Sequence, residues 1–143
     1  MSPTRVEVLP DAEALAERVA RDLLTLLRAA QATGRVPQVA LTGGTVADQV
    51  HRAVGRLAPG SGVDWARVAL WWGDERFVAP DSPDRNAGPA RRVLLDVVGA
   101  DPAKVHEMPS TADAPDVAAG AAAYSSTVLA YVRGEFDLAL RLS

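Results

Sequence analysis

The chain has 143 residues, of which 48% are hydrophobic and 23% are charged, and these proportions are typical of a folded globular domain. They exclude a disordered chain, a coiled coil and a collagen-like rod, and the length predicts a single domain over residues 1–143. The formal net charge of -3 provides no general attraction to nucleic acid, so no nucleic-acid partner is expected. The lack of cysteine excludes disulfides, thiolate metal sites and cysteine nucleophiles.

The N-terminal residues lack the apolar core of a signal peptide. No stretch approaches the roughly 18 consecutive apolar residues that a membrane-spanning helix requires. We therefore expect a cytoplasmic protein that does not associate with a membrane.

Hydrophobic periodicity changes repeatedly between the two-residue repeat of strands and the longer repeat of helices. The expected elements are strand 5–9, helix 11–33, strand 36–41, helix 45–57, strand 67–72, helix 90–98, strand 105–108, helix 116–133 and strand 136–140. Residues 79–89 contain three prolines and a glycine, and are expected to form a loop. This alternation predicts a three-layer α/β/α domain with a mostly parallel sheet that is incomplete at the C-terminus.

Two glycines follow the second expected strand, in the segment Leu41-Thr42-Gly43-Gly44-Thr45. Ligands of parallel α/β sheets bind outside the carboxyl ends of the strands. Backbone N–H groups of such a turn, together with the start of the next helix, form a natural phosphate site. Thr45 is expected to cap this helix, because Thr45 and Asp48 have capping-box spacing. A plain tight turn is the alternative interpretation.

Charged residues follow the third expected strand, in Trp71-Trp72-Gly73-Asp74-Glu75-Arg76. The Arg76 guanidinium suits phosphate or carboxylate, and the Asp74 carboxylate can accept hydrogen bonds from sugar hydroxyls. Strand alternation predicts that Asp74 and Arg76 share one side while Glu75 faces away. A local ion pair at the strand end is the alternative interpretation.

These segments, together with Asp81-Ser82-Pro83-Asp84-Arg85-Asn86, resemble the 6-phosphogluconolactonases in order and spacing. The resemblance extends over essentially the whole chain. It implies hydrolysis of 6-phosphogluconolactone to 6-phosphogluconate in the pentose phosphate pathway, without a metal or an organic cofactor. It also implies that Gly43, Gly44 and Thr45 hold the substrate phosphate, that Asp74 and Arg76 line the catalytic site, and that Asn86 contributes to binding.

In that family a histidine of a G-x-D-G-H segment serves as the base, and this segment is not found in the sequence. His51 is expected to be solvated on a helix, and His106 to be structural. The sequence therefore resembles the first three-fifths of the family domain, as expected for a truncated product or a separately encoded half. Its incomplete sheet edge favours association with a partner.

Two further functions remain open beside the lactonase. One is a non-enzymatic sugar-phosphate-binding remnant or subunit, which the missing base favours. The other is an isomerase like the glucosamine-6-phosphate deaminases, whose family shares the glycine turn. The segment from Trp72 to Arg76 and the proline-rich loop after it favour the lactonase over the deaminase.

Overall fold

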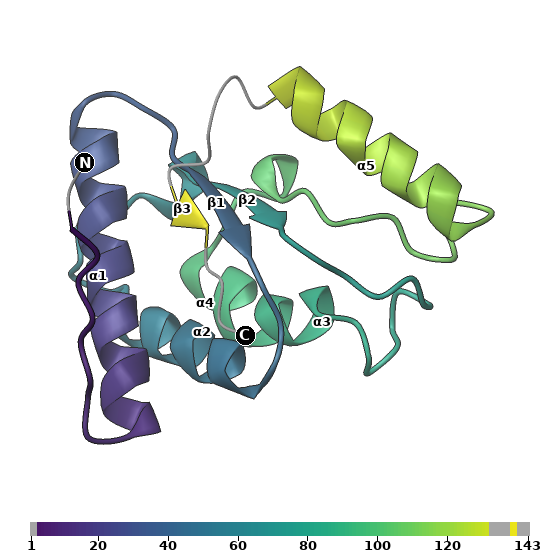
Figure 1. Ribbon diagram of the computed structural model, residues 1–143. Coiled ribbons are helices and arrows are strands. Elements are labelled where there is room, and N and C mark those ends of the chain that lie inside the picture. The colour runs from purple at the N-terminus through teal and green to yellow at the C-terminus, as the bar shows by residue number, and fades with distance from the viewer. Residues whose placement is uncertain (1–2, 132–137, 140–143) are drawn as a thin grey trace.

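The computed structural model describes residues 3–131 and 138–139, in which strands and helices alternate along the chain (Figure 1). The elements are α1 (Ala12–Ala32), β1 (Gln38–Leu41), α2 (Thr45–Leu57), η1 (Trp65–Arg67), β2 (Ala69–Trp72), α3 (Ala87–Ala90), the π-helical turn η2 (Arg91–Leu95), α4 (Asp96–Val98), η3 (Pro102–Lys104), α5 (Val117–Tyr131) and β3 (Leu138–Ala139).

The strands form one parallel sheet in the order β2-β1-β3, with β1 in the centre. Between β1 and β2 the register runs from Gln38 opposite Ala69 to Leu41 opposite Trp72. Parallel neighbours bring their carboxyl ends to the same edge, so the residues after Leu41 and those after Trp72 emerge side by side. This arrangement places both candidate segments at one edge of the sheet.

Helices cover both faces of the sheet, which confirms the predicted three-layer α/β/α architecture and its parallel sheet. On one face, Leu41 and Trp72 belong to a buried cluster with residues of α1, α2 and the α3–α4 region. On the other face, the Trp71 ring contacts the Tyr124 ring of α5 edge-on, at a centroid distance of 5.9 Å. Figure 1 shows α5 separated from α1 and α2 by the strands.

The first helix forms where the sequence predicts it. The Asp11 side chain accepts a hydrogen bond from Ala14 N at 2.8 Å and so satisfies one of the free N–H groups of the first turn. Its buried residues are Ala16, Ala20, Leu23, Leu24 and Leu27. Leu15 and Leu26 of the same helix are exposed.

The last helix, α5, is held to the sheet mainly by Tyr124. The Tyr124 hydroxyl accepts a hydrogen bond from Trp72 N and donates one to His106 O, both at 2.9 Å. Gly120 is the buried residue of α5, and a Cβ there would lie 3.6 Å from the Phe77 ring. Val117 and Leu129 remain exposed, so much of this apolar helix is uncovered within the described residues.

Two predicted strands differ from the structure. Residues 5–9 form no strand; they run along α1, where Glu7 pairs with Arg18 at 3.2 Å, and Val6 and Val8 are exposed. Their alternation is real, but no strand of the described residues lies beside them to pair with it. Residues 105–108 contribute a single bridge, between Val105 and Leu70. The parts of the predicted last helix and strand at 132–137 and 140 lie outside the described residues.

Candidate functional site

A cleft of about 460 Å³ lies at the carboxyl edge of the sheet, between the start of α2 and the segment 83–93. Thr42, Gly43, Gly44 and Thr45 line one side of it, and Asn86 lines the other. Gly73 N donates to Leu41 O at 2.9 Å and so joins the two strand ends beside this cleft. The cleft is therefore located where ligands of parallel α/β sheets bind.

The start of α2 has no side-chain cap. Gly44, and not Thr45, is the N-cap residue, and no side chain accepts a hydrogen bond from the first turn. The predicted capping by Thr45 and Asp48 was therefore wrong, because the helix starts one residue earlier than that pattern implied. Gly44 has a φ of 103°, a left-handed conformation that favours glycine. The uncapped N–H groups and the positive end of the helix dipole favour an anion in the cleft.

Asn86 lies directly against Gly43. A Cβ atom at residue 43 would come within 1.9 Å of Asn86 Oδ1, so any larger residue at this position would have to displace the Asn86 side chain. Asn86 Nδ2 also donates to Asp74 O at 3.3 Å. Asn86 therefore connects the glycine turn after β1 with the charged segment after β2.

Asp74 lies at the edge of the cleft, and Arg76 lies farther away. Thr42 Oγ1 donates to Asp74 Oδ1 at 3.4 Å, and Thr42 itself lines the cleft. Arg76 instead lines a neighbouring groove of about 320 Å³ beside Phe77 and Tyr124. Asp74 and Arg76 are both exposed, whereas the Glu75 side chain is only 2% exposed, which agrees with the predicted difference between Glu75 and its two neighbours. The prediction that Asp74 and Arg76 share one side is not confirmed, because Asp74 contacts Thr42 at the cleft while Arg76 lines the neighbouring groove.

Three arginines line the cleft: Arg85, which belongs to the loop segment that the sequence singled out, and Arg52 and Arg92, which it did not. Arg52 pairs with Asp48 at 2.9 Å, and Arg85 is buried. Arg92 projects from the π-helical turn η2 and has no ion-pair partner among the described residues. Its guanidinium is therefore available to an anion. The sequence offered no signal for this arginine, because its position depends on how η2 packs against α2.

His51 also lines the cleft, and the expectation that it is solvated was wrong. It is 3% exposed, and within the described part of the chain its Nε2 has no hydrogen-bond partner. Burial lowers the pKa of His51 from 6.5 to about 4, while the nearby Asp48 opposes this shift. His51 is consequently a neutral imidazole near pH 7 and a weak base.

His106 belongs to the opposite face of the sheet. Its ring stacks on Trp71 at a centroid distance of 3.9 Å and contacts Tyr131 at 5.2 Å. Partial burial lowers its pKa as well. These contacts agree with the structural role expected for His106.

Glu75 makes contacts in this region that sequence reasoning missed. Its carboxylate accepts hydrogen bonds from Asn86 N at 2.6 Å and from Ala87 N at 2.9 Å. Arg85 lies beside it, with Nε 4.0 Å from Glu75 Oε2, and both side chains are almost completely buried. The sequence predicted that Glu75 faces away from Asp74 and Arg76, but not which groups its side chain contacts.

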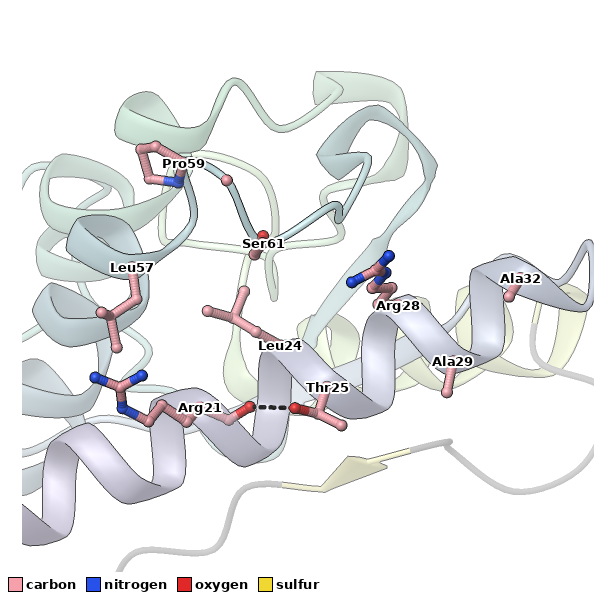
Figure 2. A pocket seen from close by; sticks show the side chains of 10 residues that line it. Arg21, Leu24, Thr25, Arg28, Ala29, Ala32, Leu57, Pro59 and Ser61 are labelled. Carbon is pink, nitrogen blue, oxygen red and sulfur yellow. Dashed lines mark hydrogen bonds between the residues drawn. The ribbon is translucent and has the colours of Figure 1, made fainter.

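Another hollow, of about 690 Å³, lies elsewhere (Figure 2). Arg21, Leu24 and Arg28 of α1 line it together with Leu57 and the loop that follows α2. Arg21 is already paired with Glu17 at 2.9 Å. This hollow contains none of the residues at the carboxyl edge of the sheet, so it is separate from the candidate site.

Neither a metal site nor a membrane-spanning helix is found in the described residues. No group of three or more histidine or acidic side chains there is arranged to hold a metal ion. No described helix is both long enough and apolar enough to cross a bilayer.

The fold and the cleft together define an α/β protein with a polar cleft at the carboxyl edge of a parallel sheet, beside the uncapped start of α2. Solved structures share this fold. A 6-phosphogluconolactonase from Thermotoga maritima matches with a TM-score of 0.80 at 20% identity, over 93% of this chain and 56% of that one. A monomeric glucosamine-6-phosphate deaminase matches with a TM-score of 0.75 at 16% identity, over 89% and 51%. Likeness at these identities shows the fold alone.

The chain belongs to the glucosamine-6-phosphate isomerase/6-phosphogluconolactonase family, whose model matches residues 10–141. It is 42% identical over 118 residues to a 6-phosphogluconolactonase of Streptomyces coelicolor, covering 80% of this chain and 45% of that protein. It is 34% identical over 128 residues to one of Mycobacterium leprae, covering 88% and 51%. The chain thus spans about half the length of these curated relatives.

Proposed function

We propose that this chain binds a phosphorylated sugar lactone and takes part in its hydrolysis, with 6-phosphogluconolactone as substrate and 6-phosphogluconate as product. The observation that carries the proposal is the placement of the uncapped start of α2 beside Asn86 and Asp74, at one edge of the sheet. Relatives named 6-phosphogluconolactonase at 42% and 34% identity support the lactonase over the deaminase alternative. No metal or organic cofactor takes part in the proposed reaction.

The proposed phosphate site is the start of α2. Backbone N–H groups at Gly43, Gly44 and Thr45 would donate to phosphate oxygens, and the helix dipole would favour the negative charge. The Thr45 hydroxyl would add a further donor. The Arg92 guanidinium, which also lines the cleft, would neutralise part of the phosphate charge.

The sugar and the reacting carbonyl would lie toward Asp74, Arg76 and Asn86. In hydrolysis, water attacks the lactone carbonyl carbon, negative charge develops on the carbonyl oxygen, and the ring C–O bond breaks to give a carboxylate and a hydroxyl. Asp74 would orient the water or a sugar hydroxyl, Asn86 would donate to the substrate, and Arg76 would stabilise the developing charge.

A second function, binding without turnover, is favoured by the two described histidines. The attacking water must lose a proton to a base. His51 is buried with a pKa of about 4, and His106 stacks on Trp71 on the opposite face. Neither is placed as that base, so we propose that turnover depends on a group beyond those described.

We further propose a partner surface and a location. The outer edge of β3 and the uncovered side of α5 would pack against polypeptide equivalent to the half of the relatives that this chain does not match. Sugar phosphates of central metabolism are cytoplasmic, so the proposed location is the cytoplasm.

Calorimetric titration with 6-phosphogluconate tests the proposal. Gluconate, which lacks the phosphate, and inorganic phosphate serve as comparison ligands. We expect 6-phosphogluconate to bind more tightly than either, because it alone occupies both parts of the site. Equal affinity for gluconate, or no binding of any phosphorylated ligand, would contradict the proposed site. Hydrolysis of the lactone above its spontaneous rate would show that the chain is an enzyme, whereas binding without such hydrolysis would show a binding protein.

A further inference from the structure

We infer that Glu75 is a positioning residue of the candidate site: its buried carboxylate holds Asn86 against Gly43 and fixes the backbone between Asp74 and Arg76. The inference rests on the proposed function, because the site that Glu75 would position is the proposed sugar-phosphate site. Glu75 itself is not proposed to touch the ligand, because its side chain is turned away from the cleft and is only 2% exposed.

The Glu75 carboxylate accepts hydrogen bonds from three backbone N–H groups in two segments. Oε1 accepts hydrogen bonds from Arg76 N at 2.8 Å and from Asn86 N at 2.6 Å. Oε2 accepts one from Ala87 N at 2.9 Å. Hydrogen bonds to an ionised group are stronger and shorter than those between neutral groups. One side chain therefore joins the segment after β2 to the start of α3, eleven and twelve residues farther along the chain.

The negative charge of Glu75 is compensated by Arg85. Arg85 Nε lies 4.0 Å from Glu75 Oε2, and the two side chains are 4% and 2% exposed. Arg85 also donates to Arg76 O at 3.3 Å and to Met108 O. A buried ion pair is maintained only when further hydrogen bonds satisfy both partners, and this pair has them. The pair thus forms one connected unit behind the site.

Three site residues depend on this unit. Arg76 and Asn86 donate their backbone N–H groups to the Glu75 carboxylate directly. Asp74 is reached through Asn86, whose Nδ2 donates to Asp74 O at 3.3 Å. Gly43 contacts the same Asn86 side chain, because Asn86 Oδ1 occupies the space where a Cβ of residue 43 would be. Releasing Asn86 would therefore change both the phosphate and the sugar parts of the cleft.

Two variants of Glu75 test this role. Glu75→Gln keeps the size but replaces one acceptor oxygen by a donor and leaves Arg85 without its counter-charge. Glu75→Asp keeps the charge for Arg85 but withdraws the carboxylate from Asn86 N and Ala87 N. The matched control is Glu107→Gln, which removes an ion pair of 2.6 Å with Arg91 where both side chains are partly exposed.

The measurements are ¹⁵N NMR spectra, which report the Gly43 backbone amide and the Asn86 side-chain amide, and titration with 6-phosphogluconate. Both are made at a temperature where circular dichroism shows each variant folded. We expect both Glu75 variants to shift these resonances and to weaken binding by about ten-fold or more, the loss expected for a charged hydrogen bond. Glu107→Gln should do neither.

The possible failures are distinguishable. If a Glu75 variant is folded and the Gly43 and Asn86 resonances stay in place, the positioning role is wrong, whatever the affinity. Shifted resonances with unchanged 6-phosphogluconate affinity would make Glu75 merely structural and would also overturn the inference. If the unaltered chain binds no 6-phosphogluconate, the proposed function fails, and the resonances alone decide whether Glu75 holds Asn86. Should Glu75→Gln not fold, Glu75→Asp provides the same comparison.

Discussion

Asn86 and Gly43 fit together so closely that a methyl group on residue 43 would overlap the Asn86 amide, with Cβ only 1.9 Å from Oδ1. We therefore expect Gly43→Ala to displace Asn86 and to weaken 6-phosphogluconate binding by about ten-fold, while the chain still folds. Titration calorimetry measures the effect. Gly73→Ala is the control, because a Cβ there would lie 3.7 Å from Leu41 O, an ordinary contact. Equal affinities for the two variants would contradict the expectation.

The neighbouring arginines of η2 differ in what they contact, and this gives a second prediction. Arg92 lines the cleft without an ion-pair partner in the described chain, whereas Arg91 pairs with Glu107 at 2.6 Å. Arg92→Gln should weaken 6-phosphogluconate binding by about five-fold and reduce its sensitivity to salt, because a screened but direct charge contact is lost. Arg91→Gln should leave both unchanged. The test is titration at two ionic strengths, and a larger effect of Arg91→Gln would refute the assignment.

His51 predicts how the stability of the fold depends on pH. Its pKa is about 4 in the folded protein and near 6.5 when unfolded. Between these values the unfolded chain binds the proton more readily, so this contribution to stability is complete above pH 6.5 and is lost as the pH falls to 4. The free energy of unfolding should decrease by about 3 kcal/mol from this source over that range.

The measurement for His51 is urea unfolding at several pH values between 7 and 4, compared with His51→Leu. The carboxylates contribute to acid unfolding in both proteins. The difference between the two plots of unfolding free energy against pH therefore gives the contribution of His51. We expect the variant to lose distinctly less stability on acidification. Parallel slopes would show that His51 is protonated as easily in the folded chain as in the unfolded one.

Tyr124 provides a prediction about α5. Tyr124→Phe removes the hydroxyl that accepts from Trp72 N and donates to His106 O, and should cost about 1–3 kcal/mol because two main-chain groups lose their partner. Hydrogen exchange should rise first in α5. Tyr131→Phe is the matched control, because Tyr131 is 65% exposed. Unchanged exchange in α5 after Tyr124→Phe would show that packing at Gly120 alone holds the helix.

The sequence was informative where local patterns decide the structure. An apolar run followed by Gly43 and Gly44 predicted β1, a turn and α2, and all three are present. Alternation past Trp72 correctly separated Glu75 from Asp74 and Arg76. These features depend on interactions between residues that are close in the sequence, so the local pattern is enough to predict them.

Features that depend on distant partners could not be predicted. Residues 5–9 alternate like a strand, but strand formation requires a neighbouring strand, and here they lie along α1 instead. His51 is buried because the segment 83–93 covers its side of α2, which the helical pattern around it does not reveal. The hydrogen bond between Asn86 N and the Glu75 carboxylate likewise could not be predicted, because it depends on how the loop after β2 folds back.

The adjacent tryptophans of β2 have a practical consequence for studying this protein. Trp71 contacts His106 and Tyr124 on the α5 face, while Trp72 and Trp65 lie in the cluster formed with α1 and α2. Intrinsic fluorescence of Trp71→Phe would therefore report the α1–α2 layer, and that of a Trp65→Phe/Trp72→Phe chain would report the α5 layer. One strand thus carries a separate optical probe for each side of the sheet.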